Sequence, residues 1–168
     1  AKAAGLACRA YRLIDDSPAG DLSFVNTPVQ PLGDVTDAAR ALKAIDATLA
    51  AGIAAVCADM VGCMQASFKL AVDYLNTRKQ FNRLIGENQT LRHRASEMLV
   101  SLESCRSMAL AAAAAIGDPA SDDAGADLSR AKLLIGRHAR AVCQSGVQMH
   151  GGIGMTDEYD IGLYMKRD

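Results

Sequence analysis

The feature that most limits the possible folds is a stretch without proline that runs from Asp34 to Asn76. Within it, apolar side chains recur every three or four positions, which is the spacing of one face of an α-helix. These positions include Leu42, Ile45, Leu49, Ile53, Val56, Met60, Met64 and Leu75. A helix of this length would be a rod of about 60 Å, longer than a small domain needs. We therefore expect one long helix, with Asp34 or Thr36 as its N-terminal cap.

Two further long helices are predicted by the same spacing. The first runs from about Gln89 to Ile116, with Asn88 as its cap, and the second from about Ala126 to Met149. The polar residues 117–125 form the loop between them, and a short fourth helix begins near Glu158. The fold class expected is mainly α: an incomplete up-and-down helical bundle in which the face for a further helix stays open. Exposed apolar surface is expected along the first and third helices, covered by a partner chain or by crystal packing.

The first 30 residues have a different pattern from the rest. Residues 6–14 and 22–25 are typical of two strands, and the polar residues 15–21 are typical of the turn between them. A lone hairpin is only marginally stable in water. We therefore interpret residues 1–30 as a strand remnant and linker at the end of a β-domain, and residues 31–168 as the helical domain.

Composition excludes several classes of function. The chain is 50% apolar with 4% aromatic residues, and its formal net charge of −1 argues against a nucleic-acid partner or an anionic membrane surface. The most apolar run, Leu49 to Met64, contains Asp59 and is shorter than the roughly 20 residues of a membrane span, so no membrane span is expected. No signal peptide is visible, and a cytoplasmic protein is predicted.

No metal site is expected. The cysteines, Cys8, Cys57, Cys63, Cys105 and Cys143, show no Cys-x-x-Cys spacing, and four of them lie on apolar helical faces. We interpret these four as small buried apolar residues in a reducing compartment. A carboxylate-bridged di-metal bundle would need Glu-x-x-His pairs, which the sequence does not provide near Glu97 or Glu103.

The third long helix ends in a segment rich in glycine. It reads Gln-Met-His-Gly-Gly-Ile-Gly-Met-Thr-Asp-Glu-Tyr and begins at Gln148. Adjacent glycines are costly inside a helix, so they terminate it. From the residues alone, two interpretations stay open: a glycine C-cap followed by a turn, or bare main chain against which a ligand lies.

This segment resembles the C-terminal signature of acyl-CoA dehydrogenases. A second stretch, Tyr74 to Phe81, resembles the Tyr-x-x-x-Arg-x-x-Phe segment of the same family, and the two occur in the family's order. The resemblance implies the C-terminal helical domain of an FAD-dependent enzyme that performs α,β-dehydrogenation of an acyl-CoA thioester. It also implies that residues 1–30 end the family's middle β-domain, and that the parent assembles as a homo- or hetero-oligomer.

The resemblance also implies FAD contacts. Arg78 matches an arginine that contacts the FAD pyrophosphate of a neighbouring subunit, which suits a planar guanidinium. Lys79 and Gln80 occupy adjoining contact positions, and Phe81 matches an aromatic residue near the adenosine. The next family position is usually glycine; Asn82 stands there instead and also tolerates a left-handed turn.

Two other groups of residues match cofactor positions. Asn88 and Gln89 match a polar pair near the ribose or adenine, although a helix cap and its neighbour explain them equally well. The glycine segment matches main chain that approaches the cofactor, through Gln148, Met149, His150, Gly151 and Gly152. The arginine and the glycine turn are expected to form half of a dinucleotide cradle, with the other half on a different polypeptide.

No catalytic base is found. In most family members the glutamate lies several residues beyond the position that matches Asp168; in others it lies on the first long helix, at the position of Gly52. A neighbouring family arginine matches Ile53. Either the chain ends before the base, or the parent is a non-catalytic scaffold or dimerisation subunit. The isolated chain is expected to have no dehydrogenase activity and weak or no FAD binding.

Overall fold

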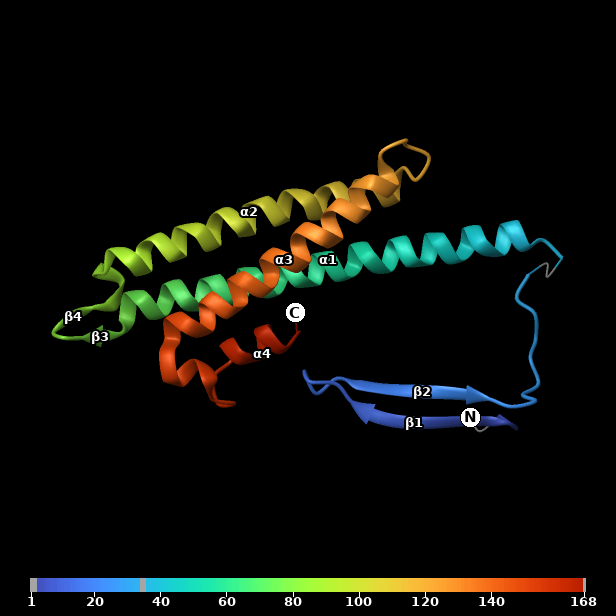
Figure 1. Cartoon of the computed structure of the whole chain (residues 1–168), viewed down its shortest axis with the longest axis horizontal. Helices are drawn as coiled ribbons and strands as arrows, with labels where there is room; N and C mark the ends of the chain where they lie inside the picture. The colour runs from blue at the N-terminus through green and yellow to red at the C-terminus, as the bar shows by residue number, and fades with distance from the viewer. Residues whose placement is uncertain (1–2, 34–35, 168) are drawn as a thin grey trace. The chain divides into compact units, whose positions relative to one another are not determined.

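The computed structural model describes residues 3–33 and 36–167, which form four α-helices, four strands and two 3₁₀ segments (Figure 1). In chain order the elements are β1 (Leu6–Arg12), β2 (Pro18–Phe24), α1 (Ala38–Thr77), β3 (Lys79–Gln80), β4 (Arg83–Leu84), η1 (Ile85–Glu87), α2 (Gln89–Gly117), α3 (Ala124–His150), η2 (Gly151–Met155) and α4 (Ile161–Arg167). The chain divides into two compact units, with the division in α1 between Asp46 and Ala47.

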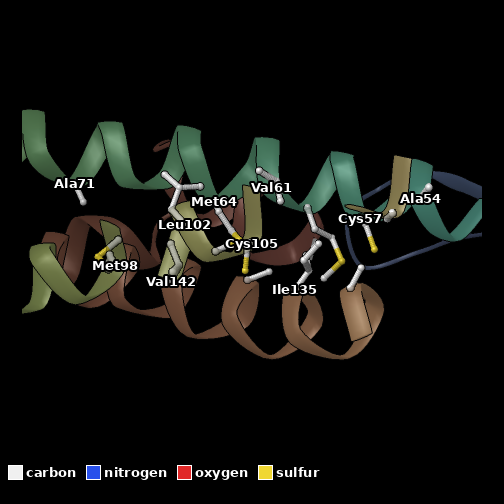
Figure 2. Packing of buried hydrophobic residues seen from close by; sticks show 14 of the residues in the cluster. Ala54, Cys57, Val61, Met64, Ala71, Met98, Leu102, Cys105, Ile135 and Val142 are labelled. Carbon is white, nitrogen blue, oxygen red and sulfur yellow. The ribbon is translucent and has the colours of Figure 1, made fainter. Parts of the chain in front are cut away.

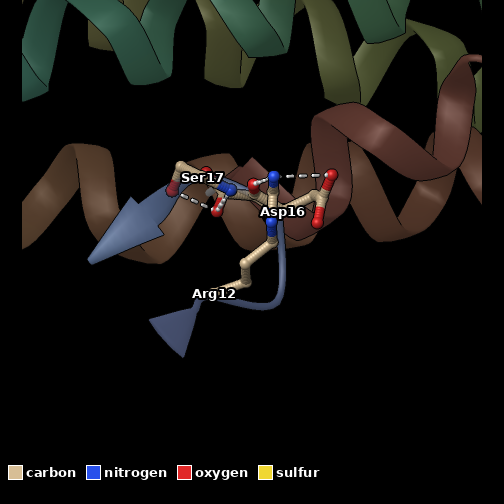
Figure 3. Close-up of polar contacts among 4 residues, drawn as sticks. Arg12, Asp16 and Ser17 are labelled. Atoms are coloured by element: carbon tan, nitrogen blue, oxygen red, sulfur yellow. Dashed lines mark hydrogen bonds and ion pairs between the residues drawn. The ribbon is translucent and has the colours of Figure 1, made fainter. Parts of the chain in front are cut away.

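Strands β1 and β2 form the predicted antiparallel hairpin, in register from Leu6 opposite Phe24 to Arg12 opposite Pro18. Polar contacts hold the turn. Arg12 donates from Nη1 to the backbone oxygen of Asp16 at 2.7 Å and pairs with its carboxylate at 3.1 Å (Figure 3). Asp16 has a φ of 65°, a conformation that aspartate tolerates better than most residues.

The three long helices are confirmed close to their predicted bounds. The predicted cap of α1 is different, however. Asp37, directly before the first helical residue, accepts a hydrogen bond from the backbone N–H of Arg40 at 2.9 Å, as an N-terminal cap does. Asp34 lies outside the described residues. The fourth helix begins at Ile161, three residues after the expected start at Glu158.

The bundle core lies between α1, α2 and α3 (Figure 2). Its fully buried side chains include Met64 from α1, Leu102 from α2, and Ile135 and Val142 from α3. Helices α2 and α3 approach each other most closely. Buried alanines on both helices, such as Ala112 and Ala131, allow this short separation because a methyl group occupies little space between two backbones.

A glycine sets the contact among α1, α3 and α4. Gly146 of α3 is buried, and a Cβ atom there would overlap Ser67 Oγ of α1 and lie 3.2 Å from Ile161 Cδ1 of α4. The helices are therefore in close contact at Gly146. At Gly136, by contrast, an added Cβ would meet nothing within 4 Å.

Exposed apolar side chains lie on α1 and α2. They are Leu42, Ile45, Leu49 and Val56 on α1, and Leu99, Val100, Leu110 and Ile116 on α2. The expectation of such a surface on α3 was wrong: in the described part of that helix only Leu133 is a large, exposed apolar residue. Most large apolar side chains of α3 face inward, because this helix packs against α2 and α4 as well as the core.

Helices α1 and α2 are both long and strongly apolar. The most apolar 18-residue windows of α1 and α2 have mean hydropathies of 1.7 and 1.4, which suffices by length and composition to cross a membrane. The apolar run Leu49–Met64 lies inside α1, which extends from Ala38 to Thr77, and the absence of a membrane span stays a prediction. Core helices of bundles have the same length and composition, and both helices contribute side chains to the core.

The glycine contact predicts opposite effects for two matched substitutions. Gly146→Ala should lower the free energy of unfolding by about 1–3 kcal/mol, because the methyl group overlaps Ser67 and Ile161. Gly136→Ala should leave it unchanged or raise it by up to about 1 kcal/mol, because alanine favours a helix. Urea denaturation of both variants measures this, and equal effects would contradict the close contact.

The cysteines should divide into two classes of reactivity. Cys57, Cys63, Cys105 and Cys143 are buried as predicted, and Cys8 is exposed. Burial, and to a lesser degree the neighbouring Cys57, raises the pKa of Cys105 to about 11. At pH 8 a thiol reagent should modify Cys8 rapidly, and the other four only after unfolding. Mass spectrometry of the labelled peptides follows this; fast labelling of Cys105 would refute the burial.

Candidate functional site

The residues directly after α1 form a small hairpin. Strands β3 and β4 pair Lys79 with Leu84 and Gln80 with Arg83, and only Phe81 and Asn82 lie between them. Both turn residues have positive φ, 52° and 61°, which is the signature of a type I′ turn. The tolerance predicted for Asn82 is confirmed in this way.

Phe81 is the unusual member of this turn. A left-handed backbone conformation costs an ordinary residue about 1–2 kcal/mol. The side chain is also 95% exposed, so little burial of the ring offsets this cost. Strained residues of this kind cluster at binding sites, where the surrounding structure holds them in place.

Two cations flank the strained turn. Arg78 and Lys79 are exposed, and no carboxylate in the described part of the chain forms an ion pair with either. The main chain of Arg78 is fixed: its N–H donates to the Tyr74 oxygen at 2.9 Å, and its oxygen accepts from the Ile85 N–H at 2.9 Å. The hairpin therefore presents positive charge from a firmly held backbone.

Asn88 has a structural role within the chain. Its side-chain oxygen accepts from Arg83 Nη2 at 2.7 Å, and its Nδ2 donates to the Ile85 oxygen at 2.9 Å. Asn88 occupies the N-cap position of α2 as predicted, but its side chain makes no cap hydrogen bond, because these two bonds hold it on the connector. Gln89, the first residue of α2, is exposed.

The glycine segment opens its main chain to solvent. Helix α3 ends at Gly151, whose φ of 66° and ψ of −138° are accessible only to glycine. A Cβ atom at Gly151 or Gly152 would meet nothing within 4 Å, so no other part of the described chain covers these peptide groups. Gln148, one turn earlier, is exposed. A ligand can therefore reach this main chain.

Met149 and His150 point inward instead. Met149 belongs to the bundle core, and His150 is 4% exposed. The His150 ring stacks on Tyr74, with centroids 4.4 Å apart and planes at 27°, and its Nδ1 donates to the Gly146 oxygen at 2.7 Å. Any contact of these two residues with a ligand must therefore come from their main chain.

The same stack brings two distant motifs to one end of the bundle. Tyr74 lies one turn before Arg78, and His150 directly precedes Gly151. The two tyrosines of this region, Tyr74 and Tyr159, were not predicted as site residues. The sequence does mark Tyr74, because it is the first residue of the Tyr-x-x-x-Arg segment. The spacing of residues did not reveal that its ring stacks on His150.

Comparison with known proteins agrees with these two motifs. Residues 42–167 match the family described as acyl-CoA dehydrogenase, C-terminal domain. The chain belongs to the acyl-CoA dehydrogenase family. It is 31% identical over 110 residues to acyl-CoA dehydrogenase IpdE2 of Mycobacterium tuberculosis, a match that covers 66% of this chain and 32% of that protein.

Solved acyl-CoA dehydrogenases have the same fold. Butyryl-CoA dehydrogenase from Megasphaera elsdenii matches with a TM-score of 0.84 at 22% identity, covering 98% of this chain and 43% of that one. A chain of the ChsE4–ChsE5 complex from Mycobacterium tuberculosis matches with a TM-score of 0.79 at 23% identity and covers 98% of this chain. The present chain spans less than half of each of these proteins, and the helical fold with its preceding strands is confirmed.

The strain at Phe81 can be measured. Phe81→Asn should raise the free energy of unfolding by about 1 kcal/mol, because asparagine accepts the left-handed conformation at lower cost. Phe81→Leu is the matched control, since it removes the ring but keeps the unfavourable backbone, and it should change stability little. Urea denaturation compares the two. A loss of stability in the asparagine variant would show that the ring stabilises the chain itself.

Proposed function

We propose that this chain is the C-terminal part of an FAD-dependent acyl-CoA dehydrogenase and contributes contacts to the pyrophosphate and adenosine of the cofactor. The observation that carries the proposal is the strained, exposed Phe81 beside Arg78 and Lys79, which have no carboxylate partner among residues 3–33 and 36–167. An aromatic ring held in solvent at a conformational cost is explained if a flat group such as adenine packs on it.

The residues present fit such a cofactor. The Arg78 guanidinium can bind two phosphate oxygens at once, and Lys79 adds a second positive charge. The space beside the Cα atoms of Gly151 and Gly152 is open, so a dinucleotide can approach the main chain closely. The chain thus offers charge, a stacking surface and bare main chain, which are the elements that hold a dinucleotide.

The chemistry divides between the cofactor and the protein. When bound, FAD accepts the hydride from the β-carbon of the acyl-CoA thioester. The residues of this chain bind and orient the cofactor. Gly52, which occupies one family position of the catalytic base, has no side chain and cannot remove a proton. The catalytic base is therefore not at residue 52.

A non-catalytic subunit is the second candidate. The absence of a carboxylate at residue 52 favours it, as does the apolar surface on α1 and α2, which a partner can cover. One solved protein with this fold is a complex of ChsE4 with ChsE5, so mixed assemblies occur among proteins of this shape. In this version the chain would bind a flavin shared with another subunit and would not itself act on the acyl-CoA.

Gly152 provides the sharpest test of the cofactor contact. In the complete polypeptide that carries this sequence, Gly152→Ala should weaken FAD binding about tenfold or more, because the methyl group occupies space that the dinucleotide needs. Stability should not fall, since the methyl group meets no other atom of the described chain within 4 Å. Flavin fluorescence titration of the apoprotein and thermal denaturation measure the two quantities.

The matched control is Gly136→Ala, which also faces open space but lies on the middle of α3. It should leave FAD affinity unchanged. Equal affinity in both variants would remove the glycine turn from the cofactor site. Dehydrogenation of acyl-CoA by the same polypeptide, followed with an artificial electron acceptor, separates the enzyme from the non-catalytic subunit.

A further inference from the structure

Three aromatic rings from three separate segments meet beneath the glycine turn. The His150 ring at the end of α3 lies 4.4 Å from Tyr74 of α1 and 4.9 Å from Tyr159, measured between ring centroids. Tyr159 also meets Tyr74 edge-on at 6.5 Å. His150 is therefore the common member that joins the end of α1 to the segment before α4.

The orientation of His150 is fixed by one hydrogen bond. A backbone carbonyl only accepts, so the 2.7 Å contact with the Gly146 oxygen places the proton on Nδ1. The other nitrogen, Nε2, is buried and has no hydrogen-bond partner in the described structure. Burying an acceptor without a hydrogen-bond partner costs desolvation free energy. Other contacts of the His150 ring therefore hold it in place despite this cost.

We propose that His150 is a positioning residue: by stacking on Tyr74 it fixes the Gly151–Gly152 main chain relative to Arg78, so that both meet one ligand. This inference rests on the proposed cofactor function and specifies which contact organises the site. His150 itself does not touch the ligand, because its side chain is buried.

The need for such a contact follows from the backbone. Gly151 occupies a region of φ and ψ that only glycine adopts, and two adjacent glycines have the greatest conformational freedom of any dipeptide. Affinity falls when a flexible segment must be ordered on binding. The residue directly before this pair is the nearest point at which a side chain can restrain it, and that residue is His150.

The restraint from the Tyr74–His150 stack extends to Arg78 through the last turn of α1. Tyr74 accepts the backbone hydrogen bond of Arg78 at 2.9 Å, so a shift of the Tyr74 backbone moves the start of the β3–β4 hairpin. A ring stacked on Tyr74 therefore acts on both halves of the site. Removing either ring should release the same restraint.

A double-mutant cycle tests this in the complete polypeptide. Tyr74→Leu and His150→Leu should each weaken FAD binding about fivefold to tenfold, and the double variant should bind no more weakly than either single one. Tyr74→Phe and His150→Phe keep flat rings and should bind within about twofold of the unchanged protein. His150→Phe removes both the unpaired Nε2 and the Nδ1 hydrogen bond to Gly146, and these two changes have opposite effects on the melting temperature.

Leu102→Ala is the control for stability alone, because Leu102 lies in the core and not among the residues of the site. It should lower the melting temperature without changing FAD affinity. Amide hydrogen exchange at Gly151 and Gly152 gives a second readout that needs no flavin. Exchange should be faster in both leucine variants than in Leu102→Ala.

The outcomes separate the inference from the proposed function. If the leucine variants lose melting temperature but keep FAD affinity and slow exchange, the stack is only structural and the inference is overturned. Additive losses of affinity in the double variant would overturn it too. If the unchanged polypeptide binds no FAD, the proposed function fails, and the exchange rates alone then decide whether the stack restrains the turn.

Discussion

The close approach of α3 to α1 at Gly146 is the contact on which the rest of this structure depends. With no side chain at residue 146, the α3 backbone lies against Ser67 of α1 and Ile161 of α4. His150 follows one turn later on α3, and Tyr74 two turns after Ser67 on α1, so the same helix register that packs the bundle also brings these rings together. The packing of the core and the geometry of the candidate site therefore depend on the same helix register.

The candidate site combines two long, rigid helices with short connections in strained or flexible conformations. Arg78 extends from a helix that is 40 residues long, and Gly151 follows one of 27 residues. The unusual conformations of this candidate site, at Phe81 and Gly151, lie just beyond the C-terminal ends of these two helices. Placing binding residues on short connections between rigid elements gives precise geometry without burdening the core with polar groups.

Side chains and main chain have different roles in this family's C-terminal segment. Met149 and His150 belong to the interior, whereas the peptide groups of Gly151 and Gly152 face solvent. The hairpin shows the opposite arrangement, with its main chain held by hydrogen bonds and the side chains of Arg78, Lys79 and Phe81 exposed. Asn88 uses its side chain to hold main chain in place. Its amide group forms hydrogen bonds to Arg83 and Ile85, which fix the connector before α2.

The sequence by itself determined the helices, their order and the family. Apolar spacing over tens of residues fixes a helix because each turn buries the same face, and the two motifs identify the family by residue type alone. It also placed the turns at Asn82 and at the adjacent glycines, since few residues tolerate those conformations.

Only the tertiary structure decided which residues meet. Met149 faces inward because of neighbours that are distant in sequence. The left-handed conformation of Phe81 and the side-chain hydrogen bonds of Asn88 depend on the register of the β3–β4 turn, which local spacing does not set. The Tyr74–His150 stack joins residues on different helices. Its existence follows from the rotation of α3 about its axis, and that rotation is fixed by side-chain packing across the whole bundle rather than by any one motif.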